Sequence, residues 1–196
     1  MRSFLLLFVL LMAAWPAHAE EDARAPVNTL NAGLLTIMKG GDALGHDGRA
    51  ARIGAVIDET FDLPRMTRTV VGAPWRDAST DERRAMVAAF RRLTVNQYAA
   101  NFDGWSGEMF RIAAKVDARG PDRLVRTELV RPDGAPVELA YRLRQRGGAW
   151  RIIDVLYDRG VSQIALQRAD FAAALKDGGP AEFVRRLDAA AAKVAG

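Results

Sequence analysis

Apolar residues in the first half of the chain recur at helical spacing. Residues 26–41 place Leu30, Leu34 and Ile37 on one face and end in a pair of glycines, which predicts a helix that ends there. Residues 47–61 carry a second apolar stripe of the same period. The chain therefore begins with two predicted helices that are separated by a glycine-rich loop.

Two capping patterns predict where the next helices begin. Asp62 and Pro64 favour the start of a short helix that would end at Gly72. Ser79 and Glu82 have the spacing of a capping box, and a long apolar stripe follows them. A short turn that contains a tryptophan joins these two predicted helices.

The hydrophobic period changes to two after Trp105. Four segments, residues 108–120, 122–131, 137–146 and 149–160, alternate between apolar and polar positions and are joined by glycine- and proline-containing turns. This pattern predicts a four-stranded antiparallel meander with one face covered and the other in water.

Helical patterns return over residues 162–179 and 180–195. The order of helices, four strands and helices predicts an α+β fold in which N- and C-terminal helices cover one face of the sheet. These helices can pack flush on the sheet, or they can stand off from it and enclose a cavity. The helix faces have many apolar groups and few acidic or amide groups, which favours an apolar cavity.

The N-terminus predicts a secretory signal peptide, residues 1–19, that is cleaved. A basic residue precedes an apolar run over residues 4–15, and Ala17 and Ala19 provide the small residues of a cleavage site. The run is shorter than the roughly 20 apolar residues of a membrane-spanning helix. We therefore expect an exported protein whose mature part, residues 20–196, forms one domain.

The composition argues against several kinds of chemistry. The chain has no cysteine, which excludes a disulfide, a thiol nucleophile and a thiolate metal site. His46 is the only histidine of the expected mature chain, and a lone histidine in a glycine-rich loop indicates a solvated residue more than a catalyst or a metal ligand. The net charge of +4 comes from scattered arginines, so we expect no nucleic-acid-binding stripe. We also expect no cofactor and no bound metal.

Two blocks of the sequence resemble the MlaC-type periplasmic lipid-binding family, also called toluene-tolerance auxiliary proteins. Residues 61–99, FDLPRMTRTVVGAPWRDASTDERRAMVAAFRRLTVNQYA, have that family's order of a short helix, a glycine, a Trp-Arg pair, a helix cap and a long helix that ends in a tyrosine. Residues 125–171 resemble its second half, including the spacing of Trp150, Asp154 and Gly160. The order of these blocks behind an export signal makes the resemblance specific.

The resemblance implies a soluble periplasmic carrier, not an enzyme, that holds the acyl chains of a phospholipid between the sheet and the helices. It implies exchange of that lipid with an outer-membrane lipoprotein complex and with an inner-membrane ABC transporter that includes an MCE-domain protein. Residues 101–112 and 160–171 look closer to the hopanoid-associated HpnM-type branch, so a hopanoid carrier is the alternative. We expect the carrier to be a monomer.

The family has no nucleophile or metal ligand to transfer to this sequence, so only pocket-lining residues can be proposed. Trp75, on its glycine–proline turn, is either an anchor that locks the helix pair onto the sheet or part of a pocket rim. On pattern alone, the aromatic residues are also ordinary core positions. The predicted lipid-binding residues are the inward-facing Phe61, Met66, Val70, Val71, Trp75, Phe90, Leu93, Tyr98, Leu139, Tyr141, Ile153, Val155, Ile164 and Phe171.

Two other functional classes are compatible with the pattern. An enzyme with a similar cone of sheet and helices would need a carboxylate or a tyrosine of shifted pKa inside the pocket, and the candidates are Asp154, Tyr141 and Tyr157. We interpret Asp154 as a structural residue, paired with an arginine or capping a nearby backbone N–H. A structural protein of the cell envelope would instead have a filled core without a cavity.

Overall fold

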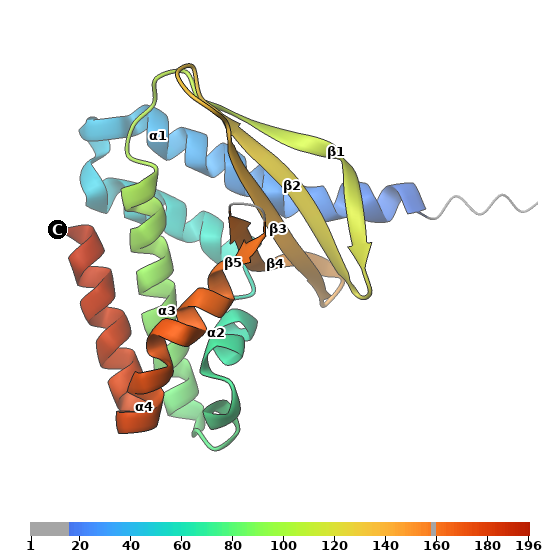
Figure 1. Ribbon diagram of the computed structural model, residues 1–196. Helices are drawn as coiled ribbons and strands as arrows, with labels where there is room; N and C mark the ends of the chain where they lie inside the picture. The colour runs from blue at the N-terminus through green and yellow to red at the C-terminus, as the bar shows by residue number, and fades with distance from the viewer. Residues whose placement is uncertain (1–15, 158–159) are drawn as a thin grey trace, which may run out of the picture.

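The computed structural model describes residues 16–157 and 160–196, so most of the predicted signal peptide lies outside the described residues. Helix α1 (Pro16–Thr60) is interrupted by non-helical backbone at Gly41 (φ 42°) and Gly45 (φ 59°). Figure 1 shows the chain turning back at this point, so that α1 consists of two arms. Glycine adopts positive φ without steric cost, which explains why the first arm ends at the predicted position.

The predicted starts of the next two helices are confirmed. Helix α2 (Leu63–Val71) is capped by the Asp62 side chain, which accepts a hydrogen bond from a backbone N–H of the first turn. Helix α3 (Thr80–Asn101) opens with a capping box. The backbone N–H of Ser79 donates to Glu82 Oε2 at 2.7 Å, and the N–H of Glu82 donates to Ser79 Oγ at 3.2 Å.

The sheet is an antiparallel meander in which each strand pairs with the next one along the chain. The prediction of four strands is wrong, because the chain turns at Gly160 (φ 110°) and pairs Ser162 with Leu156 before α4 begins. A strand of two residues is too short to produce a period-two pattern. The five strands are β1 (Met109–Arg119), β2 (Asp122–Val130), β3 (Val137–Arg146), β4 (Ala149–Tyr157) and β5 (Val161–Ser162).

Helix α4 (Gln163–Ala195) completes the fold. It begins at the predicted cap, Ser162, and contains a break at Gly179 (φ 62°), where Figure 1 shows the chain reversing direction. The second half of α4 runs beside α3, and an Arg92 guanidinium nitrogen lies 2.7 Å from a carboxylate oxygen of Asp188. The chain thus places both of its last helical segments against the helices of the first half.

One hydrophobic core lies between the helices and one face of the sheet. On this face, Val125, Tyr141, Leu143 and Ile152 are at most 1% exposed. Complete burial of a large apolar side chain contributes roughly 1.5–3 kcal/mol, so this face supplies much of the stability. The expected division into a covered face and a wet face is confirmed. The helices contribute Leu30, Leu34, Ile37, Ile53, Ile57, Met86, Phe90, Phe183 and Leu187.

A buried carboxylate ties β2 to β3 at one end of the wet face. Asp122 is 0% exposed and lies opposite Arg144 in the strand register. Arg142 Nε donates to Asp122 Oδ2 at 2.6 Å, and Arg144 Nε donates to the other carboxylate oxygen. Burial by itself raises the pKa of Asp122, but the hydrogen bonds from Arg144 and Arg142 outweigh burial and leave this pKa below its usual range.

Candidate functional site

The predicted lipid-binding residues mostly lie in the space where the helices face the sheet, and side chains of one core occupy that space. Trp75 and Phe171 are half-buried against this core. Ile153 is the extra residue of a bulge in β4 and is not part of this core. The contact of these residues with a lipid stays a prediction. The other eleven are buried: Phe61, Met66, Val70, Val71, Phe90, Leu93, Tyr98, Leu139, Tyr141, Val155 and Ile164.

Four rings, which we call the aromatic row, fill the seam between α3 and the sheet. The ring centres of Phe61 and Tyr98 are 5.8 Å apart, those of Tyr98 and Phe102 are 5.8 Å apart, and those of Phe102 and Phe110 are 6.3 Å apart. The first two rings are buried and the last two are half-buried, so the row leads from the interior towards the surface. The backbone of α3 packs mainly on α4 and α1, and α3 meets the sheet through side chains.

The three tyrosines of the chain come together around Tyr98, which belongs to the aromatic row, and we call them the tyrosine cluster. Tyr141 pairs with Val155, so Tyr157 is its diagonal neighbour on the same face of β4, within reach of an aromatic side chain. Tyr98 approaches both from α3. Burial raises the pKa of all three hydroxyls, and the two neighbouring tyrosines raise that of Tyr98 further. All three groups are therefore neutral and able to donate a hydrogen bond.

Asp154, the carboxylate considered for catalysis, caps α4. It is 8% exposed, and its Oδ2 accepts a hydrogen bond from Ser162 Oγ at 2.6 Å. Its Oδ1 accepts from the backbone N–H of Ile164 at 3.2 Å, while Ser162 Oγ accepts from the N–H of Ala165 at 3.0 Å. The interpretation of Asp154 as a capping residue is confirmed.

Trp75 lies in a short 3₁₀ helix, η1 (Ala73–Arg76), that joins α2 to α3. Its ring is half-buried against the core, and the Arg83 guanidinium lies 5.7 Å from the ring centre. Arg83 Nε also donates to the Trp75 carbonyl at 3.0 Å. Val70 and Val71, which precede this turn, are buried. These contacts hold the turn to α3 and favour the anchor interpretation, and a role at a pocket rim stays a prediction.

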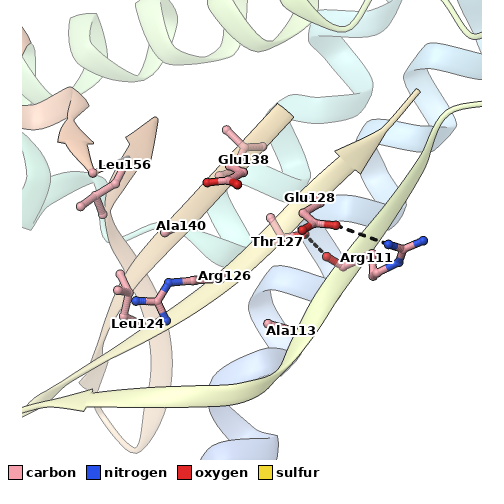
Figure 2. A pocket seen from close by; sticks show the side chains of 11 residues that line it. Arg111, Ala113, Leu124, Arg126, Thr127, Glu128, Glu138, Ala140 and Leu156 are labelled. Atoms are coloured by element: carbon pink, nitrogen blue, oxygen red, sulfur yellow. Dashed lines mark hydrogen bonds and ion pairs between the residues drawn. The ribbon is translucent and has the colours of Figure 1, made fainter. Parts of the chain in front are cut away.

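A hollow of about 380 Å³ lies on the opposite face of the sheet. In Figure 2, α1 lies behind the strands, on the far side from the labelled side chains of the hollow. Only Leu139 among the predicted residues borders it. The signal that could have found it is the presence of apolar Leu124 and Leu156 at positions of the wet face. The lining residues are Arg111, Ala113, Leu124, Arg126, Thr127, Glu128, Glu138, Leu139, Ala140, Leu156 and Gly160.

Charged side chains dominate one side of this hollow. Glu128 lies directly opposite Glu138 in the strand register, an arrangement of like charges that is destabilising by itself. Arg111 Nη1 lies 3.5 Å from Glu128 Oε2, as the dashed line in Figure 2 shows, and Arg126 pairs with Asp117. The other side of the hollow is apolar, with Leu124, Ala140 and Leu156, so the lining combines charged and apolar side chains.

His46 is half-buried beside α3, with Nε2 3.4 Å from the carbonyl oxygen of Asn96. The prediction of a solvated loop residue is therefore wrong, because the glycines make a tight break in α1 instead of an open loop. Across residues 16–157 and 160–196, no group of three histidine, aspartate or glutamate side chains could hold a metal ion. No helix of that part of the chain combines the length and the apolar character needed to cross a bilayer.

Comparison with known proteins gives a family and a fold. The model of the MlaC family, described as MlaC protein, matches residues 28–189. No curated protein matches the chain in sequence. One similar solved structure is that of a phospholipid-binding protein from Ralstonia solanacearum in complex with a phospholipid. It is 24% identical in sequence, with a TM-score of 0.75, and the match covers 89% of this chain and 99% of that chain.

Proposed function

The chain belongs to the MlaC family, and on this premise we propose that it is a periplasmic carrier that binds a phospholipid. The observation that carries the proposal is the family match, which extends over most of the chain, from residue 28 to residue 189. A protein of the same fold was solved with a phospholipid bound, which supports the class of ligand. The predicted signal peptide, residues 1–19, supports export to the periplasm.

A carrier lowers a large free-energy cost for such a ligand. Exposing an acyl chain to water costs about 0.8 kcal/mol per CH₂ group, so two long chains cost on the order of 20 kcal/mol. A lipid that crosses an aqueous compartment alone would have to meet this cost. A protein interior that encloses the chains and leaves the headgroup in water removes most of it.

We propose that the acyl chains enter the seam between α3 and the sheet. Eleven of the predicted lipid-binding residues are already gathered at this side of the sheet, and none of them is charged. The aromatic row joins this region to the surface at Phe102 and Phe110. Since α3 meets the sheet through side chains, rotamer changes and a small displacement of α3 would make room for an acyl chain. The hollow on the opposite face is the competing place, because its lining combines apolar side chains such as Leu124 and Leu156 with four charged ones.

The proposed carrier moves its phospholipid between an outer-membrane lipoprotein complex and an inner-membrane ABC transporter with an MCE-domain protein. It acts as a monomer and performs no catalysis. A hopanoid carrier of the HpnM-type branch is the second candidate, which residues 101–112 and 160–171 favour. A hopanoid is a fused-ring hydrocarbon, so the two ligands differ in the shape and in the polar groups that the seam must accept.

Native mass spectrometry of protein purified from the periplasm without detergent tests this proposal. We expect a population whose mass exceeds that of the polypeptide by one phospholipid, and solvent extraction should release that lipid for identification. A fused-ring triterpenoid in its place would favour the second candidate. A protein that remains empty in repeated gentle preparations would contradict both.

A further inference from the structure

The Tyr98 hydroxyl is a buried polar group without a hydrogen-bond partner. The residue is 5% exposed, and its Oη has no partner among the described residues. The Tyr157 hydroxyl is close enough to act on the pKa of Tyr98 as a hydrogen-bonding neighbour, but the pair does not have the geometry of a formed hydrogen bond. A buried hydroxyl that lacks a partner destabilises a protein, and such groups are rare in folded structures.

Packing alone does not explain a tyrosine at this position. The Tyr98 ring lies between two phenylalanine rings, with Phe61 at its edge and Phe102 stacked on it, both 5.8 Å away. A phenylalanine at position 98 could make the same ring contacts without burying a hydroxyl. The oxygen atom is therefore the feature of this side chain that the core does not require, which is typical of groups kept for a function.

The surroundings of this hydroxyl define what it can bind. Tyr141 and Tyr157 bring two further neutral donors to the same face of the sheet, and the rest of the seam is apolar. A group that fits here must be an uncharged acceptor attached to hydrocarbon, because a charged group would lose its hydration without an opposite charge to compensate. In a diacyl phospholipid, the ester carbonyl is that group, since it joins each acyl chain to the glycerol.

We propose that the Tyr98 hydroxyl, supported by Tyr157 and Tyr141, donates a hydrogen bond to an ester carbonyl of the bound lipid. This inference rests on the proposed carrier function and adds the chemical class of the ligand. It selects ester-linked lipids over ether-linked lipids of the same shape. It also disfavours a hopanoid, whose hydrocarbon rings carry no ester carbonyl.

A competition between two lipids tests the proposal. Delipidated protein, purified after expression of the full chain, is offered an equimolar mixture of a diester phospholipid and its diether counterpart with the same headgroup and chain lengths. Native mass spectrometry then gives the ratio of the two complexes. We expect the unaltered protein to prefer the diester by about 2- to 13-fold, the factor that corresponds to the net contribution of one hydrogen bond. In Tyr98→Phe the preference should fall towards 1.

The matched control is Thr67→Val, which removes a hydroxyl from the buried face of α2 that donates only to the Leu63 carbonyl at 2.8 Å. This variant should keep the diester preference. Thermal unfolding of the delipidated proteins verifies folding, and Tyr98→Phe should be at least as stable as the unaltered protein, because it no longer buries an unpartnered hydroxyl.

Three results would overturn the proposal. If the unaltered protein loads both lipids equally, the seam does not recognise the ester. If Tyr98→Phe keeps the full preference, another group recognises it. If the unaltered protein loads neither phospholipid, the carrier function itself fails, and this inference fails with it. This result differs from the first two, in which the protein still binds a phospholipid.

Discussion

Replacing Asp154 by asparagine separates a structural role of this carboxylate from a functional one. The carboxylate accepts hydrogen bonds from Ser162 Oγ at 2.6 Å and from the backbone N–H of Ile164 at 3.2 Å, through two different oxygens. Asparagine keeps only one oxygen acceptor. The substitution therefore replaces one of the two charged acceptor oxygens by an amide nitrogen and removes the negative charge beside the N-terminus of α4.

The magnitude follows from these two losses. A hydrogen bond to a charged group contributes roughly 1.5–3 kcal/mol, and a negative charge at a helix N-terminus contributes roughly 0.3–1 kcal/mol. Because Asp154 is only 8% exposed, we expect most of this stabilisation to be lost. The variant should be destabilised by about 2 kcal/mol, which lowers the Tm of a domain of this size by about 4–8 °C.

Two assays together decide the role. Thermal unfolding followed by circular dichroism should show the lower Tm, while the ratio of lipid to protein after solvent extraction should not change. Asp170→Asn, at an exposed position on α4, is the matched control and should leave both values unaltered. An Asp154→Asn variant with an unchanged Tm and a lost lipid content would refute this reasoning and favour a functional role.

Two further changes test other parts of the structure. Asp122→Asn should lower the Tm at pH 7, because the ionised carboxylate holds Arg142 and Arg144. Since folding lowers the pKa of Asp122, its contribution is complete above the pKa of an unfolded aspartate, about 3.9, and is lost as the pH falls through the lower folded value. A pH titration of the Tm should therefore show the difference from Asp122→Asn narrowing in acid, and a constant difference would contradict this. Trp75→Ala should lower the Tm and leave the lipid content per folded protein unchanged, whereas a lost lipid content at an unchanged Tm would favour the rim interpretation.

The sheet could be predicted closely from the sequence, because alternation of apolar and polar residues is a local property of a strand. The ends of the four long strands lie within three residues of the predicted segments, and β3 coincides with its segment. The capping pairs, such as Ser79 with Glu82, likewise act within one helical turn. The two-residue strand β5 could not be predicted, since its pairing with Leu156 depends on a turn at Gly160.

The site could be predicted only in part, because burial is the same signal for two different roles. Phe90 and Leu93 are inward-facing both in a filled core and in a lipid pocket, so hydrophobic pattern cannot separate the two. The hollow on the wet face borders an irregular part of the sheet, since its lining residue Ala113 lies within the register shift between Ile112 and Val116. Whether the Tyr98 hydroxyl has a hydrogen-bond partner depends on how α3, β3 and β4 pack together, so it could not be predicted from the local sequence.

Photo-crosslinking with a phospholipid that carries a diazirine midway along one acyl chain tests the central claim most directly, because it reports where the chain lies. After illumination of the loaded protein, peptide mass spectrometry maps the adducts. The account predicts adducts in the peptides that carry Phe61 and the α3 residues Phe90 and Leu93. Adducts confined to the peptides that carry Leu124 and Leu156, which line the hollow on the opposite face, would contradict it.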